Sequence, residues 1–397
     1  MTAKQFHDFL AEIKFKIFDL IYTINRNNTV KEFQDFPKDV QYNILKRLPV
    51  KSLIRFMCTS KSIYSIVTDP TFVDLWHTTS DMEYHIYSRC TFYDEQTFLL
   101  YKHLSGTGNA ITYKKEFTNV PVGGSHYVIG SCHGLVCFAN VFHHQGLTLI
   151  FWNPFLGKSL SIPITHLTAN IRSRALGFGY DRRSLDFKVV RIGVLPNDSK
   201  HVWAEIYTLH SHTWKIVHGS ISRPVSKIME QGIFTNGVGV IHWIMEIKST
   251  RKYKGQNTTE YVIVTYNLAK EAFGEIKVPK HIFHKYMYLT KLVISGEEKL
   301  AIYHNDRFCK LWVMEEYGES DSWKKIFGID CGDAYGKVLT SLANGNIVVS
   351  KSDGSSILYS PKNKSVRPYK KEFAMLDYVG PYVESLVFLG QQRLGGS

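Results

Sequence analysis

The chain has 397 residues and a formal net charge of +13. Its composition, 44% hydrophobic and 21% charged, is that of a globular protein and excludes a chain that is disordered throughout. The length allows two or three domains, each large enough to bury a core. Phenylalanine and tyrosine are abundant, which favours β-structure because flat rings pack well on a pleated surface.

At the N-terminus, apolar residues recur at three- and four-residue steps over residues 4–25, which predicts an amphipathic helix. These residues are Phe6, Phe9, Leu10, Ile13, Ile17, Leu20, Ile21 and Ile24. Charged residues such as Glu12 and Asp19 interrupt the pattern, so no apolar run can span a bilayer, and the basic start of a secretory signal is missing. We expect residues 1–30 to be an extension that covers part of the next domain. Docking on a partner or a membrane surface is the less favoured alternative, and we expect no membrane partner for the chain as a whole.

Three short helices are predicted after this extension. Pro37 and Asp39 favour the start of the first helix, and Pro49 ends it, because a proline disfavours helical geometry at the residue before it. The second and third helices are expected at 53–57 and 63–67, and Asp69-Pro70 ends the third. Helices this short cannot bury their apolar faces on one another alone. The remaining apolar strip therefore needs a cover, either the next domain or another protein.

The residues of 36–76, with "RLPVKSL" at 47–53, closely resemble the F-box. The resemblance implies a three-helix unit that docks on a Skp-type adaptor, which hangs from a cullin that, with a RING protein, recruits the ubiquitin-conjugating enzyme. Carried over by position, the apolar adaptor-contact surface is expected to consist of Phe36, Pro37, Val40, Ile44, Leu45, Leu48, Pro49, Leu53 and Phe56. The chain departs from the family pattern at Phe36, Ser60 and Ile63, where leucine, cysteine and tryptophan are usual. Loss of the tryptophan ring at Ile63 is expected to weaken packing by about 1–3 kcal/mol if nothing compensates.

The long remainder contains a pattern that repeats about every fifty residues, which is the scale of a kelch-like propeller blade. Each unit has an aromatic-rich strand, a short polar turn and a second strand, and these begin near residues 150, 205, 264, 311 and 357. Equivalent aromatic positions are Trp152, Tyr207, Tyr266 and Tyr359 before the turn, and Trp214, Phe273 and Trp323 after it. Another hairpin precedes each unit, for example at His133-Gly134, whose turn chemistry permits positive φ. Two hairpins per unit make a four-stranded blade, so the pattern favours a β-propeller over a β-sandwich.

A sixth blade is expected from "YHIYSRCTFY" and "FLLYKHL" near the front of this region, with "YVESLVFL" at 382–389 as the strand that closes the ring. Closure removes the exposed edges that an open sheet would have. The predicted fold class is therefore α plus all-β. A three-helix F-box at 31–80 precedes a propeller-like, about six-bladed domain at 81–397.

Four segments of the β-region carry a second resemblance: "GSCHGLVCF" at 130–138, "FWNPFLGKSLSIP" at 151–163, "FGYDRRSLDFKVVRI" at 178–192 and "EIYTLHSHTWKIV" at 205–217. They look like the F-box-associated domain of plant F-box proteins, and their order resembles the S-locus F-box and S-locus-like proteins. The resemblance implies a substrate-recognition subunit of an SCF ubiquitin ligase that binds a target protein for ubiquitylation and degradation. For the S-locus group it implies a style ribonuclease as the target. The sequence does not indicate which residues bind the substrate.

Chemistry in the chain itself is not predicted. The histidines considered for it are His133, His143, His144, His210, His212 and His218. A metal site needs about four converging ligands, which this spacing does not predict, and the six cysteines contain no CxxC pair. Ser131 and Cys132 precede His133, yet neighbours in a strand point to opposite faces. We expect no catalytic residue, metal or cofactor, and we expect reduced thiols in a cytosolic or nuclear protein.

Two alternatives remain open. One is an F-box-like scaffold that binds its partner without a ligase. The less favoured one is a nucleic-acid-binding β-domain, because basic clusters stand beside aromatic residues that would suit stacking. The clusters are Lys248, Arg251, Lys252 and Lys254 with Tyr253, and Lys362, Lys364, Arg367, Lys370 and Lys371 with Tyr369. Such clusters on turns are usually solvated loops. The positive charge favours steering of an acidic partner and opposes a basic one such as a ribonuclease.

Overall fold

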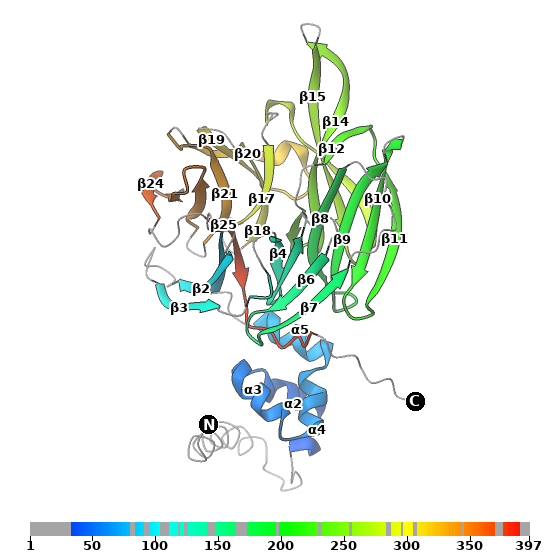
Figure 1. The fold of residues 1–397 in the computed structure, drawn as a ribbon, viewed down its shortest axis with the longest axis vertical. Helices are drawn as coiled ribbons and strands as arrows, with labels where there is room; N and C mark the ends of the chain where they lie inside the picture. The colour runs from blue at the N-terminus through cyan, green and yellow to red at the C-terminus, as the bar shows by residue number, and fades with distance from the viewer. Residues whose placement is uncertain are drawn as a thin grey trace. The chain divides into compact units, whose positions relative to one another are not determined.

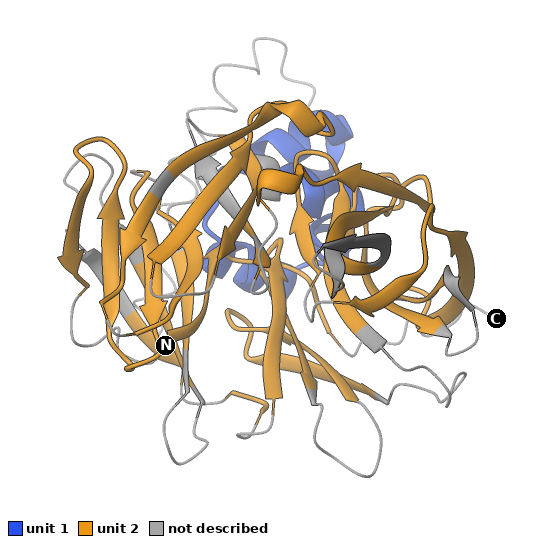
Figure 2. Ribbon diagram, turned by 90° about the horizontal axis from the view of Figure 1, so that it is seen from above, with its two compact units in different colours: residues 1–80 blue, residues 81–397 orange. Residues whose placement is uncertain are grey.

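The computed structural model forms two compact units, residues 1–80 and residues 81–397 (Figure 2). The residues that it describes are 33–79, 84–90, 96–103, 111–117, 120–122, 126–140, 148–163, 173–195, 198–228, 232–253, 256–282, 287–294, 297–304, 308–332, 334–342, 345–369 and 376–389. The predicted N-terminal helix at 4–25 lies outside them.

The described part of the first unit is helical (Figure 1). Its elements are the 3₁₀ turn η1 (Phe33–Asp35) and the helices α2 (Lys38–Leu45), α3 (Val50–Met57), α4 (Lys61–Val67) and α5 (Pro70–Thr79). Helix α5 was not predicted, because Asp69-Pro70 was interpreted only as the end of α4. The same pair also begins α5: the Asp69 carboxylate accepts the Thr71 amide at 2.8 Å, and proline is tolerated in a first helical turn.

Prolines and buried side chains define the helical unit. The Pro37 carbonyl accepts the Gln41 amide at 3.0 Å and the Pro49 carbonyl accepts the Leu53 amide at 3.1 Å, so each proline begins the helix that follows it. The buried Gln41 side chain donates to the Phe36 carbonyl at 2.6 Å and fixes the chain before α2. Phe72 of α5 is fully buried, so α5 supplies part of the cover that three helices alone would lack.

The second unit is a six-bladed β-propeller, as predicted (Figure 1). Blade 1 consists of β25 (Leu376–Tyr382), β1 (Tyr84–Cys90), β2 (Gln96–His103) and β3 (Ile111–Phe117). Blade 2 consists of β4 (His126–Cys132), β5 (Leu135–Asn140), β6 (Thr148–Asn153) and β7 (Lys158–Pro163). Blade 3 consists of β8 (Ser173–Asp181), β9 (Asp186–Leu195), β10 (Asp198–Thr208) and β11 (Thr213–Ser220).

The other three blades follow the same antiparallel order. Blade 4 has two short inner strands, β12 (Val225–Ile228) and β13 (Ile233–Thr235), beside β14 (Val240–Tyr253), β15 (Gln256–Asn267) and β16 (Ala272–Lys277). Blade 5 consists of β17 (Met287–Ile294), β18 (Glu297–His304), β19 (Phe308–Met314) and β20 (Trp323–Asp330). Blade 6 consists of β21 (Gly336–Ser341), β22 (Ile347–Lys351), β23 (Ser356–Ser360) and β24 (Ser365–Pro368). The 3₁₀ turns η2 (Lys280–Ile282) and η3 (Ser320–Ser322) lie between strands.

Both ends of the β-region build blade 1, which closes the ring. Strand β25 pairs antiparallel with β1, with Tyr382 opposite Tyr84. The innermost strands β25, β4, β8, β13, β17 and β21 each contact the next, all the way round. The predicted closing strand at 382–389 was wrong, because pairing ends at Tyr382. The apolar pattern beyond it reflects burial of Leu386 and Leu389 in a segment that is not a strand.

The predicted repeat corresponds to the hairpin between the third and fourth strands of a blade. Tyr207 stands opposite Trp214, and Tyr266 stands opposite Phe273, in the same register. Four of these hairpins have a four-residue turn whose last residue has positive φ: Gly157, His212, Glu271 and Lys364. The His133-Gly134 turn of blade 2 also has positive φ at both residues, as predicted.

Alternate residues of one strand pack on both neighbouring blades. In β6, the Trp152 ring lies 5.4 Å from the Phe98 ring of blade 1. The adjacent Phe151 ring lies 5.8 Å from the Phe178 ring of blade 3. Successive side chains of a strand point to opposite faces, so a blade enclosed between two others needs apolar residues at consecutive positions. This explains the aromatic-rich strands of the repeat.

Substitution of Gly134 by alanine is expected to destabilise the propeller. Gly134 has φ of +75°, and a Cβ there would lie 2.5 Å from the Val383 carbonyl oxygen and would also clash with Ser385. Gly157 has a similar φ of +61°, but nothing lies within 4 Å of its Cβ position. Both variants should lose about 1 kcal/mol to backbone strain, and Gly134→Ala should lose about 2 kcal/mol more to overpacking. Equal urea-unfolding midpoints for the two variants would contradict this account.

Candidate functional site

The nine predicted adaptor-contact residues fall into two groups in the helical unit. The side chains of Phe36, Ile44, Leu45, Leu48 and Leu53 are buried, at 6% exposure or less. Pro37 and Pro49 are exposed, and Val40 and Phe56 are half-buried. The first group can stabilise the unit, while the second group is accessible to a partner of this chain. The half-buried Ile54 on α3 was not among the predicted residues, although its place on a short amphipathic helix is a signal for it.

The departures from the F-box pattern lie in this unit too. Ile63, at the position where tryptophan is usual, is 8% exposed and so occupies a core position with a smaller side chain. In α5, Trp76 is buried and Phe72 packs edge-on against Tyr42 with ring centroids 5.3 Å apart. Burial raises the pKa of Tyr42, and the charge of Asp69, which also accepts its hydrogen bond, raises it further. Large rings are therefore present in the unit at other positions.

The propeller has two loop faces. The turns between first and second and between third and fourth strands of a blade meet at one face, and β1 begins and β25 ends there. We call this the terminal face. The connections between second and third strands and between successive blades lie at the opposite face, which we call the distal face. The β14–β15 hairpin projects beyond its neighbours at the distal face, with Tyr253 paired to Gln256 (Figure 1).

At the terminal face, the ends of the inner strands line a partly open pocket of about 30 Å³. Its walls include His133, Asn236, Glu298 and Tyr382. The His133 Nε2 lies 3.2 Å from the Asn236 Oδ1, and the His133 ring stacks on Tyr180 with centroids 4.1 Å apart. A volume of this size is enough for an ordered water molecule.

The Ser131, Cys132 and His133 triplet is not arranged for nucleophilic catalysis. The Ser131 hydroxyl donates to the Pro381 carbonyl at 3.0 Å and lies 2.7 Å from the Tyr378 hydroxyl. His133 instead contacts Asn236, which follows β13 in blade 4. These residues hold the turn of blade 2 against its neighbours.

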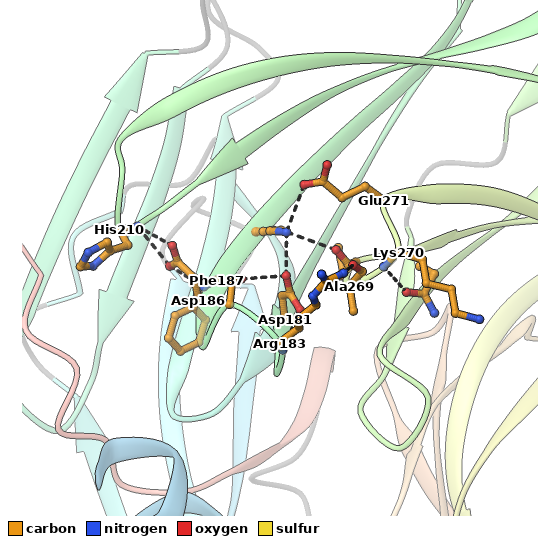
Figure 3. A network of polar contacts seen from close by, with 12 residues as sticks. Asp181, Arg183, Asp186, Phe187, His210, Ala269, Lys270 and Glu271 are labelled. Atoms are coloured by element: carbon orange, nitrogen blue, oxygen red, sulfur yellow. Dashed lines mark hydrogen bonds and ion pairs between the residues drawn. The ribbon is translucent and has the colours of Figure 1, made fainter. Parts of the chain in front are cut away.

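A network of charged and polar contacts joins blade 3 to blade 4 (Figure 3). The buried Lys188 Nζ lies 2.7 Å from the Asp181 Oδ2 and 3.4 Å from the Glu271 Oε1, and it donates to the Leu268 carbonyl at 3.2 Å. Lys215 of blade 3 also pairs with Glu271. Lys188 therefore connects the β8–β9 turn to the β15–β16 turn of the next blade.

Asp181 and Asp186 flank one turn, and their pKa values move in opposite directions. Burial tends to raise the pKa of Asp181, but hydrogen bonds from Lys188 and Ser184 outweigh burial and lower it. Burial raises the pKa of Asp186, and the backbone amides of His210 and Phe187 only partly offset it. Opposite shifts in a carboxylate pair can indicate acid–base chemistry. Here both carboxylates bind the turns themselves, so we assign them to structure.

The two predicted basic clusters differ in how much of them the structure describes. Lys362, Lys364 and Arg367 are exposed, but Tyr369 is buried and its hydroxyl lies 3.0 Å from that of Tyr87. Tyr369 is therefore not available for stacking on a base. The side chains of the 248–254 cluster and the pair His143 and His144 lie outside the description.

Metal ligands, membrane-spanning helices and disulfides were considered within the described residues. In them, no three His, Cys, Asp or Glu side chains are grouped so that they could hold a metal ion. None of the described helices has the length and hydropathy needed to cross a membrane. Cys58, Cys132, Cys137, Cys309 and Cys331 form no disulfide.

Comparison with known sequences identifies both units. The profile of the F-box domain matches residues 33–75, and that of the F-box associated beta propeller domain matches residues 82–387. The chain belongs to the F-box associated beta propeller family. Among Arabidopsis thaliana relatives, "F-box/kelch-repeat protein At3g23880" is 27% identical over 321 residues, covering 74% of this chain and 79% of the relative. "F-box protein CPR1" is 24% identical over 319 residues, covering 74% and 72%.

The family assignment confirms the predicted F-box protein with an associated propeller. The S-locus subgroup stays a prediction, because these relatives are F-box and F-box/kelch-repeat proteins. The blade loops that the sequence could not assign to a substrate are distributed over both faces of this F-box-associated propeller.

Asp181→Asn is expected to destabilise the propeller by about 3 kcal/mol at pH 7, because it leaves the buried Lys188 ammonium without its shortest ion pair. The lowered pKa means that ionised Asp181 contributes stability above its unfolded pKa of about 3.9 and loses it as pH falls through the folded pKa. The deficit of the variant should therefore persist from pH 7 to pH 5 and shrink below pH 4 in denaturant titrations.

The matched control is Glu315→Gln, which removes the exposed partner of a partly buried Lys299. Its cost should be within about 0.5 kcal/mol. A deficit of Asp181→Asn no larger than that of Glu315→Gln would show that Lys188 does not depend on Asp181.

Proposed function

We propose that this protein is the non-catalytic substrate-recognition subunit of an SCF-type ubiquitin ligase. The F-box would bind a Skp-type adaptor and, through it, a cullin and a RING protein, while the propeller binds the target. The observation that carries the proposal is that one chain joins an F-box to an F-box associated propeller as two compact units.

Binding alone is sufficient for this role. A target held beside the ubiquitin-conjugating enzyme has a raised effective concentration, so the receptor needs no reactive group of its own. The buried charges of Asp181, Asp186 and Lys188 are accounted for by contacts between turns. This supports a receptor whose rigid frame positions loops.

The burial of each side chain narrows the set of F-box residues that would contact the adaptor directly. Pro37, Val40, Pro49 and Phe56 reach the surface, so we assign direct contact to them. The five buried residues of the predicted set would act by holding the helices in place. A charged substitution at Leu53, which is fully buried, would unfold the helical unit and report on stability rather than on contact.

Phe56→Ala should weaken binding to a purified plant Skp-type adaptor by roughly tenfold or more, because a half-buried ring at a contact surface commonly contributes 1–3 kcal/mol. Helical circular dichroism should be nearly unchanged. The control is Val366→Ala, an exposed apolar residue on β24 of the propeller. Equal adaptor affinity for both variants would remove Phe56 from the contact surface, and no binding by the wild-type chain would favour the scaffold alternative.

For the target we propose the distal face, since the described chain enters and leaves the propeller at the terminal face. Two aromatic side chains there are about half exposed, Phe308 at 47% and Tyr335 at 50%. They lie near each other, because a Cβ on the adjacent Gly336 would be 3.3 Å from the Cβ of Cys309. Exposed aromatic residues are frequent energetic centres of protein interfaces.

Tyr335→Ala is expected to reduce turnover of the target while leaving adaptor binding intact. Quantitative proteomics should identify proteins whose abundance falls when the wild type is expressed and recovers with a proteasome inhibitor. In cells that express Tyr335→Ala those proteins should accumulate, whereas Ile216→Ala, on the outer strand β11, should behave as wild type. Full turnover by Tyr335→Ala would place the target elsewhere.

We propose only that the target is a protein, and we do not assign its identity. A style ribonuclease is the target that the S-locus resemblance implies, and the charge of +13 disfavours a strongly basic one. A cytosolic or nuclear location would fit the ligase role.

A further inference from the structure

We propose that the exposed cations Arg47, Lys51 and Arg55, which we call the basic stripe, dock an acidic surface of the Skp-type adaptor. This inference rests on the proposed function and adds the charge of the partner to it. The adaptor would be steered to the F-box by charge and then held by apolar contact.

The stripe lies in a part of the chain without any carboxylate side chain. Between Asp39 and Asp69 there is no aspartate or glutamate, although the whole chain has 35. The same interval holds five basic residues: Lys46, Arg47, Lys51, Arg55 and Lys61. All of them except Lys46, which is half-buried, are exposed. The side chains between Asp39 and Asp69 therefore carry charge of one sign.

The cations alternate along the chain with the accessible apolar contacts. Lys51 and Arg55 are four residues apart on α3, so they are neighbours on one side of the helix. Phe56 follows Arg55 by one residue, and the exposed Pro49 stands between Arg47 and Lys51. Charges at the rim of an apolar contact mainly raise the association rate and select partners of opposite sign. An acidic protein surface with an apolar centre fits this arrangement better than a nucleic acid does.

Local helix stability does not explain the position of Lys51. Lys51 lies in the first turn of α3, and Lys61 begins α4. A cation near a helix N-terminus opposes the helix dipole, whereas an anion there is stabilising. In α2 the first turn carries Asp39, as the dipole favours. Arg55 lies in the last turn of α3, where the dipole favours a cation, but Lys51 is unfavourable within its own helix, which points to a role outside it.

Lys51→Glu in the full-length chain gives a test in which binding and stability move in opposite directions. The new carboxylate should suit the first turn of α3, so thermal stability should be maintained or raised. Association with a purified plant Skp-type adaptor at 50 mM NaCl should nevertheless slow by roughly tenfold. At 500 mM NaCl the difference from wild type should shrink, because salt screens exposed charges. Lys362→Glu, the same change on an exposed propeller turn, should behave as wild type.

Three results separate the possibilities. Adaptor binding by Lys51→Glu equal to that of Lys362→Glu at low salt would overturn the inference and leave the proposed function standing. Absence of adaptor binding by the wild type at either salt concentration would overturn the proposed function itself. Loss of binding to a single-stranded oligonucleotide by Lys51→Glu, with adaptor binding unchanged, would reassign the basic stripe to phosphate recognition.

Discussion

The pairing of β25 with β1 is the constraint on which the rest of the propeller depends. Without it, blade 1 would have three strands, and two open sheet edges would face solvent where the ring should meet. With it, every inner strand has a neighbour on both sides, and the contacts run without interruption from β25 through β21. The loops on both faces are then positions on a rigid ring, which lets short turns present side chains at fixed distances.

Two kinds of contact connect the blades. Blades 1, 2 and 3 meet through rings, with Trp152 and Phe151 facing opposite ways from one strand. Blades 3 and 4 are joined in addition by Lys188, whose ammonium binds a carboxylate of its own blade and a backbone carbonyl of the next. Apolar packing tolerates small displacements, but hydrogen bonds to particular carbonyls depend on direction. The charged contact therefore defines how the β8–β9 and β15–β16 turns sit against each other.

Features that the sequence repeats were predictable. The Tyr207 and Trp214 pair recurs in register as Tyr266 and Phe273, so spacing located these hairpins in five blades. The sixth blade was expected from the strand pattern at the front of the region. Features that occur only once in the sequence could not be predicted in this way. Apolar periodicity could not distinguish the buried segment at 383–389 from a strand, because burial without pairing leaves the same pattern.

The candidate site was predictable to a similar extent. Motif spacing identified Phe56 and Leu53 together, but only the structure separates the half-buried ring from the fully buried one. Helix α5 was missed because Asp69-Pro70 is compatible with the end of one helix and the start of the next. The Lys188–Glu271 contact joins residues from two blades, and no local pattern indicates which of many lysines and glutamates meet across such a separation.

The order of strands in blade 1 has a consequence for how the protein is made. Helices α2 to α5 and strand β1 leave the ribosome early, whereas β25 emerges near the end of synthesis. At roughly 5–20 residues per second, β1 would wait for its partner strand for some tens of seconds or less. During that interval a chaperone, or a second nascent chain, has access to an edge that the finished molecule no longer offers.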